Sequence, residues 1–124
     1  MSFPNGAART EDFDTDPLRL NVANGTLIFH RPADGQPARV ELVAYSRKDK
    51  ITKMAAAEYL PDATCPIYDA FLEEVQPDPE MREFLDVWSG YNSLGLADAQ
   101  KMSIFYGQGS HGKGVWLNTL AHIL

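Results

Sequence analysis

The chain has a single cysteine, Cys65, among its 124 residues. An internal disulfide is therefore excluded, and so is a zinc site built on cysteines. Such sparse use of cysteine is typical of a reducing, cytoplasmic compartment. The first residues lack the apolar core of a signal peptide, and no apolar run reaches the roughly 20 residues that a membrane-spanning helix needs. The sequence therefore predicts a cytoplasmic protein without a membrane partner.

Basic residues are also few, with 11 Lys and Arg against 17 Asp and Glu and a net charge of −6. Neutralising the phosphates of a nucleic acid requires clustered Lys and Arg. The composition therefore argues against strong, nonspecific nucleic-acid binding by this chain alone, but leaves open a supporting role in a larger DNA-handling assembly. The length and the 44% hydrophobic content fit one modest globular domain.

Polar and acidic residues dominate the first 17 positions. We expect residues 1–17 to form a flexible tail or linker. Its acidic side chains are predicted to be a solvated charge run, and they are Glu11, Asp12, Asp14 and Asp16.

A β-rich region follows the tail. Apolar residues alternate with polar ones over 18–22, and Asn24-Gly25 then precedes a second strand-like run at 26–29. Asn-Gly between two such runs predicts a hairpin with a type I′ turn. Residues 39–45 are aliphatic and alternating enough for a third strand. The basic stretch 48–53 is predicted to be an exposed turn.

Proline positions mark the helices that come next. Residues 54–58 have helix propensity, but Pro61 ends whatever forms there. Pro66 suits the first turn of one helix, and Asp78 followed by Pro79 suits the cap and first position of another. Both helices carry apolar stripes, and Gly95 is a predicted terminator. Five residues of the second helix are predicted to be buried in the protein core, and they are Met81, Phe84, Leu85, Trp88 and Tyr91.

The stretch from Lys101 to the end of the chain predicts a strand, a glycine-rich loop and a helix, which is the setting of a phosphate-binding P-loop. Residues 101–106 are the predicted strand, and 115–124 form a helix apolar enough to be buried. The candidate nucleotide-binding residues are Gly107, Gln108, Gly109, Ser110, His111, Gly112, Lys113 and Gly114.

Each part of this loop has a physical role in binding phosphate. Gly107 and Gly112 allow backbone angles that other residues resist, and they let the chain approach phosphate closely. Backbone N–H groups and the helix N-terminus supply partial positive charge. Lys113 supplies a full charge for the β- and γ-phosphates and is the candidate catalytic residue. The alternative is a purely structural glycine loop.

Gly114 departs from the general motif. That position usually holds Ser or Thr, whose hydroxyl binds Mg²⁺. Glycine supplies no ligand, although a water can take its place because Mg²⁺ usually keeps several waters. No protein ligand for a metal is therefore assigned, and Mg²⁺ is expected to arrive with ATP.

Several short motifs follow one another along most of the chain in an order that is found in a known family. The chain resembles the phage and plasmid primase–helicase family, which is related to the poxvirus primase-helicase and belongs to superfamily 3. The segments that carry the resemblance are residues 20–27, Lys-Ile-Thr-Lys at 50–53, Cys-Pro at 65–66, Phe-Leu-Glu-Glu-Val at 71–75, 77–80, 84–91, 100–102 and the loop with Leu-Asn-Thr-Leu at 117–120. His111 stands where the family usually has Asn, and residues 39–45 do not align firmly.

The resemblance implies an α+β N-terminal module, with a β-hairpin and strands before helices, at 18–95. It also implies the first β–P-loop–α unit of a truncated α/β ATPase at 96–124. The parent protein would be an ATP-dependent DNA helicase or primase that acts in replication as a ring-shaped homo-oligomer. Its DNA-contacting and remaining catalytic residues would lie downstream, so we do not expect this chain to hydrolyse ATP by itself. The alternatives are a non-catalytic protein-interaction module and a truncated remnant.

Overall fold

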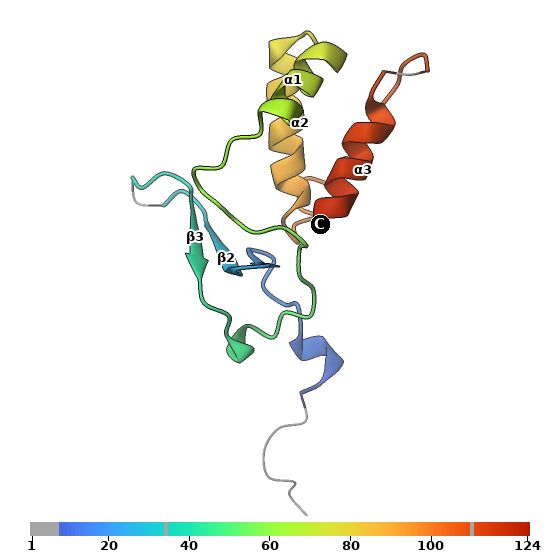
Figure 1. Ribbon diagram of the computed structural model, residues 1–124. Helices are drawn as coiled ribbons and strands as arrows, with labels where there is room; N and C mark the ends of the chain where they lie inside the picture. Colours follow the sequence, from blue (N-terminus) through green and yellow to red (C-terminus); the bar gives the residue numbers. More distant parts are fainter. Residues whose placement is uncertain (1–7, 34, 110) are drawn as a thin grey trace, which may run out of the picture.

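The computed structural model describes residues 8–33, 35–109 and 111–124. Within these residues the chain forms an antiparallel sheet followed by three α-helices, so the predicted α+β class is confirmed for the N-terminal module. Figure 1 shows the sheet at one end of the molecule and the helices grouped at the other, joined by a long connection. None of the helices in the described ranges is long and apolar enough to cross a membrane.

The sheet has the strand order β1-β2-β3, with β1 at Arg19–Val22, β2 at Gly25–His30 and β3 at Arg39–Val43. Short 3₁₀ turns, Thr10–Asp12 and Arg47–Asp49, lie before and after it. Leu27 of β2 is opposite Leu20 on one side and Leu42 on the other, so these side chains share one face of the sheet. The same face carries the core of the module, in which Val22, Leu27 and Ala55 are buried.

The predicted hairpin is confirmed, but its turn differs from the expected one. Val22 pairs with Gly25, so the two turn residues are Ala23 and Asn24 rather than Asn24 and Gly25. Asn24 does not have a positive φ, as a type I′ turn would require. Its side-chain amide donates to the carbonyl of Tyr59 and accepts from the N–H of Tyr59, both at 2.9 Å. These two hydrogen bonds join the hairpin turn to Tyr59, which is 35 residues further along the chain.

Residues 50–65 form no helix or strand, so the helix propensity of residues 54–58 is not realised. The N–H of Ala55 donates to Asn21 at 2.8 Å, and the N–H of Ala23 donates to Ala57 at 2.9 Å, so this segment runs beside β1. The N–H of Ala56 donates in the other direction, to Ile123 at 3.0 Å. Backbone groups that serve two neighbours in this way are not available for a helix.

Both proline-marked helices begin where the sequence predicts. Helix α1 spans Pro66–Val75 and α2 spans Pro79–Asn92, and the side chain of Asp78 caps α2 by accepting from the N–H of Glu80. The predicted burial of α2 is wrong, because none of its described side chains is buried. Its aromatic residues instead stack on one another along the helix, Phe84 on Trp88 and Trp88 on Tyr91, with ring centroids 6.1 and 5.9 Å apart.

The acidic stretch before the sheet is not simply a solvated charge run. Asp14 accepts hydrogen bonds from the side chain and the N–H of Thr52, and these bonds hold the pKa of Asp14 below its ordinary value. The N–H of Arg9 and then the charge of Lys50 lower the pKa of Asp12. These contacts attach the end of the acidic stretch to the segment that follows the sheet.

Helix α3, at Lys113–Ile123, has one buried side chain, Trp116, which contacts α1. Trp116 is only 4% exposed, and its indole N–H donates to the hydroxyl of Tyr68 on α1 at 3.1 Å. Phe105 lies against the same indole, with ring centroids 5.1 Å apart. Burial raises the pKa of the Tyr68 hydroxyl. The rest of α3 does not meet the prediction of a fully buried helix, since Val115 and Leu117 are exposed.

Replacing Gly25 should destabilise the sheet. A β-carbon there would lie 2.5 Å from the carbonyl oxygen of Val43, and the φ of +156° is unfavourable for other residues. We expect Gly25→Ala to lower the free energy of unfolding by about 1–3 kcal/mol, measured by urea denaturation. Gly90→Ala is the matched control, because Gly90 lies in α2 with open space around it. This variant should raise the free energy of unfolding by about 0.5–1 kcal/mol, because alanine favours a helix over glycine. Equal stabilities for the two variants would contradict this account.

Removing the hydroxyl of Tyr68 should weaken the attachment of α3. Tyr68→Phe leaves the buried indole N–H of Trp116 without its hydrogen-bond acceptor. A buried donor without a partner costs about 1–3 kcal/mol, so unfolding should occur at lower urea concentration. Tyr106→Phe makes the same chemical change at an exposed side chain and should leave the urea midpoint unchanged. A Tyr68→Phe midpoint equal to that of the wild type would show that the bond contributes nothing.

Candidate phosphate-binding loop

The candidate loop leads directly into α3. Gly107, Gln108, Gly109 and His111 are exposed, and Gly112 is the N-cap of the helix. Ser110, which the sequence also places in the loop, lies outside the described residues. The loop is therefore an open, solvent-facing turn at the N-terminal end of a helix.

The strand predicted before the loop is not formed. Residues 101–106 belong to no strand, and all three strands of the described sheet come from 19–43. The reason is the absence of a neighbour, because an extended chain becomes a strand only when another strand takes its hydrogen bonds. Within the described part of the chain, the local unit is a loop and a helix, and a complete β–loop–α unit is not present.

Gly112 needs to be glycine for two reasons. Its φ of +72° lies in the left-handed region. A β-carbon at this position would lie 2.6 Å from Cγ1 of Val75 and 3.1 Å from Cζ of Phe71. The loop therefore packs Gly112, the N-cap of α3, against α1.

Lys113 folds back over the loop that precedes it. Its ammonium group donates to the carbonyl oxygens of Gly107 and Gln108, both at 3.3 Å. A β-carbon at Gly107 would lie 2.9 Å from the Nζ of Lys113. Gly107 was predicted to adopt backbone angles that other residues resist, but its φ is not positive. The absence of a side chain at Gly107 gives the ammonium group room to lie over the loop.

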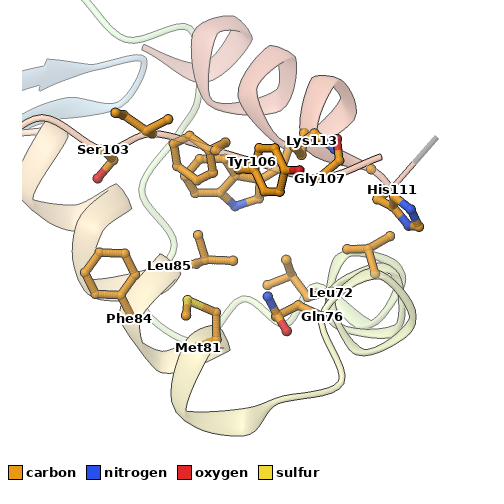
Figure 2. Close-up of a pocket in the computed structure, with 15 residues that line it drawn as sticks. Leu72, Gln76, Met81, Phe84, Leu85, Ser103, Tyr106, Gly107, His111 and Lys113 are labelled. Carbon is orange, nitrogen blue, oxygen red and sulfur yellow. The ribbon is translucent and has the colours of Figure 1, made fainter. Parts of the chain in front are cut away.

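A pocket of about 530 Å³ lies beside the loop, between α1, α2 and the segment that leads to α3 (Figure 2). Its wall contains no carboxylate among the described residues, and Lys113 is the full positive charge at its rim. The lining residues are Leu72, Val75, Gln76, Met81, Phe84, Leu85, Ser103, Ile104, Phe105, Tyr106, Gly107, His111, Gly112, Lys113 and Trp116. A negatively charged ligand at this rim would therefore be attracted by Lys113 and would not be repelled by a negative charge on the described wall.

Gly114 is exposed in the first turn of α3, with no described atom within 4 Å of where its β-carbon would lie. It supplies no ligand for a metal. The described residues also contain no group of three or more His, Cys, Asp or Glu side chains placed to hold one.

Sequence reasoning identified the loop but missed the contacts that position it. Tyr68 carried no signal of its own, because a tyrosine in a helix with an apolar stripe is unremarkable. Its role depends on Trp116, which is 48 residues further along the chain. Val75 likewise gave no signal of its role, and the structure places it against Gly112.

Comparison with known proteins connects the sheet and α1 to a family. Residues 6–77, more than half of the chain, match the family described as "D5 N terminal like". No curated protein and no solved structure matches the chain. The family match ends before the loop, so it is independent of the loop geometry. The predicted kinship with primase–helicases is confirmed at this level: the chain belongs to the D5 N-terminal-like family, the N-terminal domain of D5-like primase–helicase proteins.

Proposed function

We propose that this chain is the N-terminal part of a superfamily 3 primase–helicase and that its loop, Gly107–Gly114, binds the phosphates of ATP. Membership of the D5 N-terminal-like family supports the first half of the proposal. The position of Lys113 carries the second half, because its ammonium group lies over the loop at the N-terminus of α3.

The chemistry of the loop favours an anion. The first N–H groups of a helix have no partners within the helix, and the N-cap Gly112 has no side chain to satisfy them. These groups and the helix dipole attract negative charge. Lys113 adds a full charge at the same place and would reach the β- and γ-phosphates by leaving the carbonyl oxygens that it now contacts. The described residues of the pocket wall include no carboxylate that would repel them.

Mg²⁺ would enter as part of MgATP, held by the phosphates and by water. The remaining partners belong to the proposed parent protein. These are DNA and the other subunits of a homo-oligomeric ring, both contacted by segments beyond the loop. In that parent, Lys113 would hold the phosphates while ATP is hydrolysed. In the 124-residue chain the loop would bind nucleotide without assembling the other groups that hydrolysis needs.

Lys113→Ala should weaken ATP binding strongly. A hydrogen bond to a charged group is worth about 1.5–3 kcal/mol, so the dissociation constant for MgATP should rise at least about tenfold. Isothermal titration calorimetry with MgATP measures this directly. Lys101→Ala is the control, because it removes the same charge from an exposed position before the loop. Equal affinities for the wild type and Lys113→Ala, or no binding by the wild type at millimolar MgATP, would refute the proposal.

Gly114→Ser should make ATP binding depend more strongly on Mg²⁺. The site has open space for a side chain and no positive φ, so the hydroxyl can be added without strain. It would then supply the ligand that the usual motif provides. We expect the ratio of the dissociation constants in EDTA and in Mg²⁺ to rise several-fold in this variant, by the same calorimetry. Gly109→Ser, also in open space, is the control. An unchanged ratio in Gly114→Ser would argue against a phosphate site at this end of α3.

A further inference from the structure

The pocket beside the loop is apolar over most of its wall, because leucine, valine, methionine and aromatic side chains line it. Its volume of about 530 Å³ is within the roughly 300–1,000 Å³ that is usual for small-molecule sites. Gly107 and Lys113 line it too, so the pocket is continuous with the loop. A ligand with an anionic end at the loop could therefore place an apolar, flat group in the pocket.

Gln76 is the polar exception in the part of the wall that α1 provides. It is the C-cap of α1, and its N–H donates to the carbonyl of Leu72 at 2.9 Å. Arg82 of α2 donates to the carbonyl of Gln76 at 2.8 Å. Figure 2 shows the side chain of Gln76 reaching into the space between α1 and the loop. Both backbone groups of Gln76 are therefore held, while its side-chain amide makes no hydrogen bond within the described residues and can serve a ligand.

We propose that this pocket binds the adenine base of the nucleotide and that Gln76 is the residue that selects adenine. The inference rests on the phosphate-binding role proposed above for Gly107–Gly114. The apolar wall would shield a flat aromatic base from water. The amide of Gln76 presents an N–H donor and a C=O acceptor, which match N7 and N6 of adenine. Guanine has two acceptors, O6 and N7, on the same edge, so the amide carbonyl would oppose an acceptor.

The proposal gives the N-terminal module a part in nucleotide binding. Gln76 lies within residues 6–77, which match the family, whereas Lys113 lies outside them. The base and the phosphates would thus be bound by different parts of the chain. These parts already meet where Trp116 of α3 donates to Tyr68 of α1. Bound nucleotide would therefore add a second connection between α1 and the start of α3.

Gln76→Met tests the role of the amide, because methionine has a similar length and shape but cannot form these hydrogen bonds. Isothermal titration calorimetry would compare MgATP, MgGTP and magnesium-bound inorganic triphosphate. In the wild type, MgATP should bind at least about tenfold more tightly than triphosphate, because the base adds apolar contact. MgATP should also bind at least about threefold more tightly than MgGTP.

In Gln76→Met, the dissociation constant for MgATP should rise at least about threefold, and the preference for ATP over GTP should disappear. The affinity for triphosphate should stay unchanged, which also shows that the variant keeps an intact loop. Gln36→Met is the matched control, because Gln36 is exposed in the connection between β2 and β3. Its affinities for all three ligands should equal those of the wild type.

A second measurement needs no variant. In the wild type, nuclear Overhauser contacts should join the H2 or H8 proton of bound adenine to methyl groups of Leu72 and Leu85, which line the pocket. Triphosphate that binds as tightly as ATP, or bound ATP without these contacts, would overturn the base site and leave the phosphate loop standing. Equal losses in Gln76→Met and Gln36→Met would overturn the role of Gln76. Failure of the wild type to bind either ATP or triphosphate would overturn the proposed function and this inference together.

Discussion

The hydrogen-bonded segment from Ala55 to Tyr59 is the constraint on which the rest of the structure depends. On one side, the N–H of Ala55 donates to Asn21 of β1, and the carbonyl of Ala57 accepts from Ala23 in the hairpin turn. On the other, Ala56 donates to Ile123, the last residue of α3. Figure 1 shows the C-terminus beside this connection, between the sheet and the helices. One segment thus links the sheet to the far end of the helix that carries the candidate loop.

Helix α3 is consequently held at both ends by different parts of the chain. Its C-terminal end is fixed to the connection through Ile123, and its N-terminal end is fixed where Gly112 packs on Val75 of α1. Between these ends, Trp116 is buried against Tyr68. The direction of the helix N-terminus, and with it the direction of its partial positive charge, is therefore set by packing contacts outside the loop. The proposed anion site would therefore be preorganised by these contacts before a ligand binds.

The sequence predicted the elements whose signals are local. Pro66 and Pro79 mark helix starts because proline is compatible with the first helical turn, and both helices begin there. The hairpin was predicted from Asn24 and Gly25, and the strand register confirms it. The side chain of Asn24 is hydrogen-bonded to Tyr59, and the turn residues are Ala23 and Asn24 instead of Asn24 and Gly25. A contact with a residue so far along the chain leaves no local signal.

The errors have the same origin. The helix propensity of residues 54–58 is weaker than the hydrogen bonds offered by β1, and no local pattern reports that competition. The predicted strand at 101–106 has strand-like side chains, yet a strand is a property of a pair. The exposed face of α2 follows from the pocket beside it, because several of its apolar side chains line that space without filling it.

The loop itself separates residues that packing explains from residues that it does not. Gly112 would be required for its contact with Val75 whether or not phosphate binds, so its presence says little about function. Lys113 is different, because its ammonium group contacts only two carbonyl oxygens of the loop, and none of the ion pairs among the described residues includes it. Both of these hydrogen bonds are exposed to solvent and go to neutral groups, so they contribute little to the stability of the fold. Packing therefore does not account for a lysine at this position, whereas the anion site that we propose would.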